Sequence, residues 1–309
     1  MGVVAINSES KNVSELLSAA DVACYVAKDQ GRNRVHVYQP DDNELTQRRG
    51  EMRWVSRITH ALNHERLCLF YQPIVSVLPD VAMLPHYEIL VRLHDESGAL
   101  IPPTAFIPAA ERFDLISAID RWVVRATFNH ITARDKGDEG MCAINLSGQS
   151  MDDEFLSFVE TELERVAINP RHLCFEITET AAITNLTRAA RFIDRLKKRG
   201  CCFALDDFGC GVSSSTYLKN LNVDYLKIDG NFIRNMVNDP VDYAMVEAIC
   251  RIGHVMGLKI IAKCVENQAT LDAVSRLGID FAQGYHIAKV RSVGEWAPLL
   301  RRGSVATKK

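Results

Sequence analysis

Several apolar segments of this chain end in polar side chains of the kinds that bind ions or take part in catalysis. These side chains are Glu88, Asn145, Glu176, Asp206 with Asp207, Lys227, Lys263 and Gln283. Taken singly, each is an ordinary residue for the end of a strand. Brought together from different strands, carboxylates and amides repel one another unless a cation lies among them. Oxygen ligands of this kind suit Mg²⁺ or Mn²⁺ better than zinc, and the adjacent Asp206 and Asp207 would bridge two ions in a phosphoryl-transfer site.

The elements that must position these side chains alternate regularly along the chain. Apolar, strand-like runs occur at 67–75, 86–93, 141–146, 172–178, 201–206, 223–228, 258–263 and 280–285. Amphipathic patterns predict helices at 115–134, 151–166, 186–199, 241–256 and 267–277. Near-continuous apolar strands that alternate with helices indicate a mostly parallel sheet covered by helices. Eight such units favour a (β/α)8 barrel, whose active site lies at the carboxyl ends of its strands. A doubly wound open sheet is the alternative, but no G-x-G-x-x-G follows the first strand.

The first residues have a different pattern. Residues 2–6 read as a strand, 14–29 as a helix and 34–39 as a second strand, and so short a fragment cannot close a core. We therefore expect residues 1–38 to be the end of a domain whose front is missing. Residues 39–50 then form a linker, 51–301 the barrel, and 302–309 a tail.

Composition excludes several classes of protein. The 309 residues carry 36 Lys and Arg against 39 Asp and Glu, so no basic excess favours duplex nucleic acid as a partner. We expect no membrane segment and no secretory signal, because the apolar runs are short and the first residues carry no basic start. The cysteine count of nine is odd and includes no C-x-x-C pair, which favours reduced thiols in the cytoplasm.

Motifs across residues 51–300 resemble those of EAL-domain cyclic-di-GMP phosphodiesterases. YEILVRL (87–93) resembles the E-A-L-x-R signature, with Ile89 in place of alanine. Similar motifs, in matching order and spacing, are YQPIV (71–75), FIPAAE (106–111), NLSGQS (145–150), FEITET (175–180), DDFGCGVSS (206–214), YLKID (225–229) and QGY (283–285). Residues 20–38 resemble the end of a GGDEF diguanylate cyclase domain, but the GG[D/E]EF signature is absent.

The resemblance implies a (β/α)8 TIM-type barrel with an irregular first strand, preceded by a short β-α-β fragment. It implies hydrolysis of cyclic di-GMP to linear pGpG with one or two Mg²⁺ or Mn²⁺ ions. The first ion would be held by Glu88, Asn145, Glu176 and Asp206, and the second by Asp206 and Asp207.

It also implies roles for further residues. Lys227 would orient the attacking water or stabilise charge on the phosphate, and Arg92 would pair with a phosphate. Contacts with the ligand or the polar surroundings of the site would come from Gln72, Asp229 and Gln283. Glu179 would anchor the loop that carries Asp206 and Asp207, which links the site to a homodimer interface in this family. The full-length protein would be cytoplasmic, or attached to a membrane through missing N-terminal regions.

One residue departs from the family pattern at a position where chemistry is expected. The family usually has A-E-G-V-E on the seventh strand, whereas this chain has AKCVE at 262–266. Lys263 thus replaces a glutamate that would hold the second metal ion or its water, and Cys264 replaces a glycine. A protonated lysine would repel a nearby divalent ion, but beside Asp207 it would form an ion pair and replace the charge of the second ion. A second departure, IAKV at 287–290, matters less for chemistry.

Two hypotheses follow from Lys263. The chain is a metal-dependent phosphodiesterase with weakened turnover, or it is a binding module for cyclic di-GMP that no longer hydrolyses it. A third idea makes a neutral Lys263 a general base, which requires a strongly lowered pKa. A metal-dependent barrel hydrolase with another substrate is a more distant alternative.

Overall fold

The computed structural model describes residues 2–6, 16, 20, 35–37, 54–77, 85–134, 140–166, 168–210 and 215–296. By backbone contacts the chain divides into two units, 1–64 with 104–115 and 65–103 with 116–309. In the first unit, β1 (Gly2–Val3) pairs in parallel with β2 (His36–Val37). Each of these two-residue strands lies within one of the two N-terminal segments predicted to be strands. Most of the helix expected at 14–29, all of the linker at 39–50 and the tail at 302–309 lie outside the described residues.

The first unit also contains a helix over residues 54–63 and most of α3 (Pro103–Arg112). Ile58 and Phe106 are fully buried, and the ring of Phe106 lies 6.3 Å from that of Trp54. This packing buries the apolar sides of both helices.

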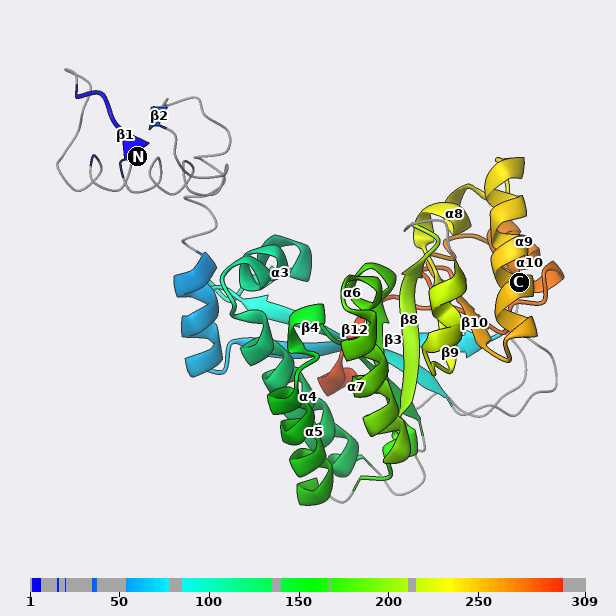
Figure 1. The fold of residues 1–309 in the computed structure, drawn as a ribbon, viewed down its shortest axis with the longest axis horizontal. Coiled ribbons are helices and arrows are strands. Elements are labelled where there is room, and N and C mark those ends of the chain that lie inside the picture. Colours follow the sequence, from blue (N-terminus) through cyan, green and yellow to red (C-terminus); the bar gives the residue numbers. More distant parts are fainter. Residues whose placement is uncertain are drawn as a thin grey trace. The chain divides into compact units, whose positions relative to one another are not determined.

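Eight strands of the second unit form a closed barrel (Figure 1). They are β3 (Leu67–Ser76), β4 (His86–His94), β6 (Met141–Asn145), β7 (Leu173–Thr178), β8 (Cys202–Phe208), β9 (Tyr225–Ile228), β10 (Lys259–Ala262) and β11 (Phe281–Ala282). Strand β3 is antiparallel to both its neighbours, β4 and β11, whereas the other neighbouring pairs are parallel. The barrel with an irregular first strand is thus confirmed, and the open sheet is wrong because β3 closes the ring.

The five predicted helices are present, and each observed end lies within two residues of the predicted one. They are α4 (Ile116–Ala133), α5 (Asp153–Val166), α7 (Leu186–Lys198), α9 (Pro240–Val255) and α10 (Gln268–Arg276). Their apolar faces pack toward the barrel and toward one another, and Figure 1 shows α4, α5 and α7 as one neighbouring group. No helix in the described part of the chain is long and apolar enough to cross a membrane.

Short elements that the hydrophobic pattern did not predict complete the second unit. They are β5 (Leu100–Ile101), α6 (Glu179–Thr184), α8 (Gly230–Asn235), β12 (Arg291–Ser292) and the 3₁₀ turns η1 (Gly148–Ser150), η2 (Pro170–His172), η3 (Ser215–Asn220) and η4 (Val293–Glu295). Strand β11 is shorter than the expected 280–285. After it the chain turns at Gly284, where an added Cβ would lie 2.2 Å from the Val265 carbonyl oxygen, so only glycine fits there.

Small side chains fill the middle of the barrel. Ala143 on β6, Cys174 on β7 and Ala204 on β8 are completely buried and pack together. Side chains alternate between the two faces of a strand, so these small residues separate two layers of larger inward-facing ones. One layer lies at the carboxyl ends of the strands and the other at their amino ends. The cysteines in the described part of the chain are free thiols.

Candidate active site

The polar residues predicted at strand ends meet at the carboxyl end of the barrel. Glu88 comes from β4, Asn145 from β6, Glu176 from β7 and Asp206 from β8, which are consecutive strands of the ring. The pairing of Asn145 with Glu176 and of Thr178 with Asp206 brings these side chains to one edge. The prediction that they converge therefore holds in the geometry of the barrel.

Lys227 on β9 connects two of these carboxylates. Its side chain is completely buried, and its Nζ donates to Glu176 Oε2 at 2.5 Å and to Glu88 Oε2 at 3.0 Å. Glu88 also accepts hydrogen bonds from Asn145 Nδ2 at 2.8 Å and from Gln283 Nε2 at 2.6 Å. The buried charges are thus paired and hydrogen-bonded, which is the condition under which charges persist in a protein interior.

The surroundings move the pKa values of these groups in different directions. Burial opposes ionisation of Glu88, but Lys227, Lys263 and two amide hydrogen bonds lower the pKa of Glu88 to about 2. Burial, together with the neighbouring Glu88 and Asp206, raises the pKa of Glu176 to about 8 despite the attraction of Lys227. Burial disfavours the charge of Lys227, but the carboxylates around it raise its pKa above the usual value. The cluster therefore moves the pKa values of its two glutamates apart, as expected where two carboxylates share one buried site.

A backbone irregularity in β8 directs two consecutive carboxylates to the same ammonium group. Neighbouring residues of a regular strand point to opposite faces. The pairing of β8 with β9 shifts register between Leu205 and Phe208, and Asp207 has a left-handed φ of 53°. As a result, Lys263 Nζ lies 2.8 and 2.9 Å from the two carboxylate oxygens of Asp206 and 2.7 Å from Asp207 Oδ1.

The side chain of Lys263 is therefore held within this cluster as an ammonium group. Burial opposes its charge, but Asp206, Glu88 and Asp207 raise the pKa of Lys263 above its usual value. The idea that a neutral Lys263 acts as a general base is wrong for this structure, because it requires a lowered pKa. The expected ion pair with Asp207 is present, and a pair with Asp206 accompanies it.

The donor set fits one divalent ion and does not fit two. Glu176 Oε1 is buried without a hydrogen-bond partner among the described residues, so an oxygen donor is left for a cation. With all four carboxylates ionised, as ligands of a metal ion must be, the four carboxylates and two ammonium groups give the cluster a formal charge of −2, which a single divalent ion balances. Lys263 takes the carboxylate oxygens that a second ion would use. Within the described ranges no group of three His, Cys, Asp or Glu side chains is close enough together to hold a metal ion as they stand.

Glu179 attaches the segment after β8 to the neighbouring helix α6. Its carboxylate accepts hydrogen bonds from the Gly209 backbone N–H at 3.0 Å and from the Tyr217 hydroxyl. Burial and the carboxylate of Glu179 raise the pKa of the Tyr217 hydroxyl, which keeps it a hydrogen-bond donor. Sequence reasoning predicted an anchoring role for Glu179 but missed Tyr217, because no local pattern joins residues so far apart in the chain.

The other predicted site residues differ in how closely they join the cluster. Gln72 accepts from Gln283 Nε2 at 3.2 Å and so lies beside Glu88. Arg92 lies beyond Glu88 on β4, and its Nη1 donates to the Val91 carbonyl at 2.9 Å. Asp229 caps α8 by accepting from the Asn231 N–H at 2.7 Å, and no hydrogen bond of the described residues joins it to the carboxylates.

A comparison with known families decides the family of this chain. A family model described as "EAL domain" matches residues 55–290. The chain belongs to the EAL-domain family. Among solved structures, PaMucR phosphodiesterase in complex with c-di-GMP has a TM-score of 0.74 at 31% identity, over 79% of this chain and 99% of that one. The FimX EAL domain of Pseudomonas aeruginosa, bound to c-di-GMP, has a TM-score of 0.72 at 26% identity, over 77% and 96%.

Two curated relatives have higher sequence identity to this chain. Cyclic di-GMP phosphodiesterase PdeB of Shewanella oneidensis is 39% identical over 92% of this chain and 33% of its own length. Cyclic di-GMP phosphodiesterase PdeF of Escherichia coli is 40% identical over 76% of this chain and 31% of its own length. The chain therefore spans about a third of the length of these relatives.

Proposed function

We propose that this chain binds cyclic di-GMP at the carboxyl end of its barrel and hydrolyses it to linear pGpG, at a rate that Lys263 keeps low. The observation that carries the proposal is the hydrogen-bonded cluster of Glu88, Asn145, Glu176 and Lys227 at that end, with Asp206 held near it by Lys263. The names of PdeB and PdeF and the ligand of the PaMucR complex support the choice of substrate.

The residues of this cluster and its surroundings would have different roles in the reaction. Glu88, Asn145, Glu176 and Asp206 would hold one Mg²⁺ or Mn²⁺, which when bound supplies an activated water and neutralises phosphate charge. Lys227 keeps its proton among the carboxylates and provides a buried donor for the attacking water or a phosphate oxygen. Arg92 offers a planar guanidinium for a second phosphate, and Glu179 positions the segment after Asp207. Contacts of Gln72, Asp229 and Gln283 with the ligand or its polar surroundings complete the proposal.

Lys263 is the reason to expect slow turnover. An ammonium group about 4 Å from a divalent ion is repelled by about 8 kcal/mol at an effective dielectric constant of about 20. The Lys263 amine therefore opposes a second ion at Asp207, and its bonds to both oxygens of Asp206 also weaken the binding of the first ion. The second candidate function, a receptor that binds cyclic di-GMP without hydrolysing it, is favoured by the same contact.

The decisive experiment incubates the purified chain with Mn²⁺ or Mg²⁺ and cyclic di-GMP and separates the products by chromatography. We expect slow formation of pGpG and, for Lys263→Glu, a rate higher by a factor of at least 100. The exposed Lys198→Glu is the matched control and should leave the rate unchanged. Binding without pGpG in both the natural chain and Lys263→Glu supports the receptor instead. Equal rates in those two proteins contradict the role given to Lys263.

We also propose that residues 1–38 derive from the end of a GGDEF domain. The match with PdeB runs over 287 residues, more than the range 55–290 contains, and MucR of Pseudomonas aeruginosa, named a bifunctional diguanylate cyclase and phosphodiesterase, matches 94% of the chain. The parallel pairing of β1 with β2 suits a strand–helix–strand unit.

Homodimerisation through the Asp206–Ser214 loop stays a prediction, since residues 211–214 lie outside the described part. The cytoplasmic location and a membrane attachment through missing regions also stay predictions.

A further inference from the structure

The segment that follows Asn145 is held by side chains from helices outside the barrel. It covers residues 146–151 and contains the 3₁₀ turn η1. Asn145 itself ends β6, and its Nδ2 donates to Glu88 Oε1 at 2.8 Å in the carboxylate cluster. The Leu146 N–H donates to the Glu176 carbonyl at 2.8 Å, which extends the contact between β6 and β7 by one residue. Beyond Leu146 other contacts must fix the backbone, because the strand pairing ends there.

A buried carboxylate of α4 accepts two hydrogen bonds from this segment. Asp120 is 5% exposed, and its Oδ2 accepts from the Ser147 N–H at 3.1 Å and from the Ser150 hydroxyl at 2.6 Å. Ser147 is the N-cap of η1, and Ser150 is its last residue. One oxygen atom of Asp120 thus joins both ends of the turn to the buried face of α4. It also fixes the peptide group that comes immediately after Leu146.

An arginine of α7 binds carbonyl oxygens of the same segment. Arg188 Nη2 donates to the Gln149 carbonyl at 3.0 Å, and Arg188 Nε donates to the Met151 carbonyl. A guanidinium has several N–H donors in one plane, so it can bind two carbonyls at once. Gly148 packs against α6, since an added Cβ would lie 3.0 Å from the Ala181 Cβ. The segment is therefore fixed from three helices, α4, α6 and α7.

We propose that Asp120 and Arg188 are positioning residues, which hold the Asn145 amide in place for the divalent ion. The inference rests on the proposed function, in which Asn145 is a ligand of that ion. Only Leu146 separates Asn145 from the peptide group that Asp120 binds, so a shift of the segment moves the end of β6. Groups that orient a metal ligand without touching the metal typically contribute a factor of about 10–100 to its affinity.

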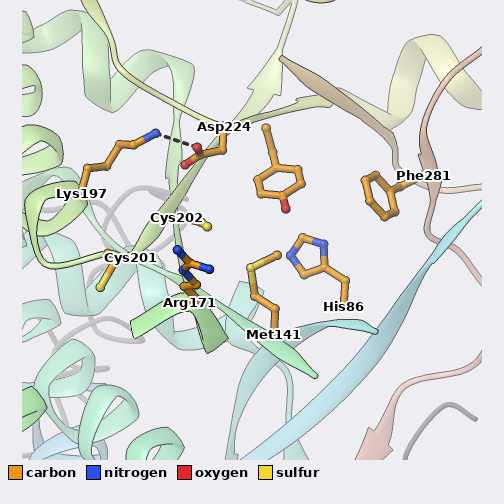
Figure 2. A pocket seen from close by; sticks show the side chains of 10 residues that line it. His86, Met141, Arg171, Lys197, Cys201, Cys202, Asp224 and Phe281 are labelled. Atoms are coloured by element: carbon orange, nitrogen blue, oxygen red, sulfur yellow. Dashed lines mark hydrogen bonds and ion pairs between the residues drawn. The ribbon is translucent and has the colours of Figure 1, made fainter. Parts of the chain in front are cut away.

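The chain offers a matched control at the opposite end of the barrel. Asp224 also accepts from one backbone N–H, that of Phe203 at 2.9 Å, and from one side chain, Lys197 Nζ at 2.6 Å. Figure 2 shows the Lys197–Asp224 pair, which lies directly before β9 and thus at the amino ends of the strands. Removing the Asp224 carboxylate should therefore cost stability without changing the carboxylate cluster.

The test measures Mn²⁺ binding to the purified chain by calorimetry, at a temperature at which each variant is folded. Asp120→Ala should weaken Mn²⁺ binding about tenfold. Asp120→Asn keeps an acceptor oxygen and should recover most of that affinity, and Asp224→Ala should bind as tightly as the natural chain. Arg188→Gln should weaken Mn²⁺ at least threefold, whereas Arg191→Gln, which lies on the same helix and loses only its pair with Asp153, should not.

The outcomes separate this inference from the proposed function. The positioning role is overturned if Asp120→Ala binds Mn²⁺ as tightly as the natural chain, or if Asp224→Ala weakens binding equally. Should Asp120→Ala fail to fold, Arg188→Gln decides, because the Arg188 side chain is 34% exposed. Asn145→Ala is the reference for the ligand itself. If the natural chain binds no Mn²⁺, or Asn145→Ala binds it unchanged, the proposed metal site fails and this inference fails with it.

Discussion

Lys227 and Lys263 bring two ammonium groups into contact with the carboxylates at the carboxyl end of the barrel. Lys227 is completely buried between Glu88 and Glu176, whereas Lys263 is 21% exposed and holds Asp206 and Asp207. Each lysine therefore both stabilises the metal-free chain and limits how many cations the site accepts. The two lysines differ in their consequences, because only Lys263 takes the oxygens that a second ion needs.

Removing the buried ammonium tests its structural role. Lys227→Met keeps a long side chain but leaves Glu88 and Glu176 without their shared partner. Breaking a buried ion pair costs about 3–5 kcal/mol, so we expect the free energy of unfolding in EDTA to fall by about 3 kcal/mol or more. Urea unfolding measures this loss, and Mn²⁺ should restore part of it because the ion neutralises the same carboxylates.

A surface lysine provides the comparison for that variant. Lys259 pairs with Asp280 at 2.8 Å but is 48% exposed, so Lys259→Met should cost about 1 kcal/mol or less. Equal losses for the two methionine variants would contradict the role of Lys227 as a buried partner of two carboxylates.

At the scale of elements, a close contact joins the start of α8 to the segment after β10. Cys264 has a left-handed φ of 55°, a conformation that suits glycine, and an added Cβ at Gly230 would lie 2.5 Å from Cys264 Sγ. The cysteine thus keeps the backbone conformation that a glycine would adopt and takes up the space beside Gly230.

This contact predicts an interaction between two substitutions. Cys264→Gly should raise the free energy of unfolding by about 1 kcal/mol, because it removes the left-handed strain. Gly230→Ala should lower it by about 1–3 kcal/mol through overpacking. In the double variant Gly230→Ala with Cys264→Gly, the cost of the alanine should nearly disappear. Additive effects in thermal unfolding of the three variants would show that the two positions do not touch.

Asp280 connects three elements around β11. Its carboxylate accepts from Lys259 Nζ at 2.8 Å and from the Ile260 N–H at 2.9 Å, and it lies 2.9 Å from His254 Nε2 of α9. Burial alone would raise the pKa of Asp280, but these hydrogen bonds lower it below its usual value of 3.8. A lowered pKa contributes stability above pH 3.8, and this contribution is lost as the pH falls through the folded-state pKa.

The Asp280→Asn variant tests that dependence. We expect the free energy of unfolding to be about 2 kcal/mol lower at pH 7, because the charge-assisted hydrogen bonds of Asp280 disappear. The difference in the free energy of unfolding between the variant and the natural chain should become smaller below pH 3.8, where Asp280 of the natural chain becomes protonated. Urea unfolding of both proteins between pH 7 and pH 3 measures it, and a difference that is constant with pH would contradict the assignment.

At the scale of the whole molecule, the charge of the cluster sets how many divalent ions the barrel accepts. The formal charge of −2 predicts one tightly bound Mn²⁺ per chain, whereas Lys263→Glu brings the charge to −4 and predicts two. Calorimetry with Mn²⁺ counts the ions directly, without any need for turnover. Lys198→Glu, which lies at the end of α7, should still bind one ion. Two tight ions in the natural chain would show that Lys263 moves aside.

The barrel itself was predictable from the sequence to within a few residues, because strands and helices of this length have clear apolar periodicity. Elements α6 and α8 were missed because six residues are too few for that pattern. The convergence of Glu88, Asn145, Glu176 and Asp206 was also predictable, since the carboxyl ends of the parallel strands of a barrel meet at one end. The partner of Glu179, Tyr217, was not, because it comes from a turn far along the chain.

The sequence alone determined the alternation of strands and helices, the family motifs and the presence of a lysine where an acid is expected. Only the tertiary structure decided what that lysine does. The register shift in β8 and the left-handed Asp207 turn two consecutive carboxylates toward one ammonium group, which no regular strand would allow. The burial of His86 likewise became visible only in the folded barrel, because burial depends on residues that are distant in the chain.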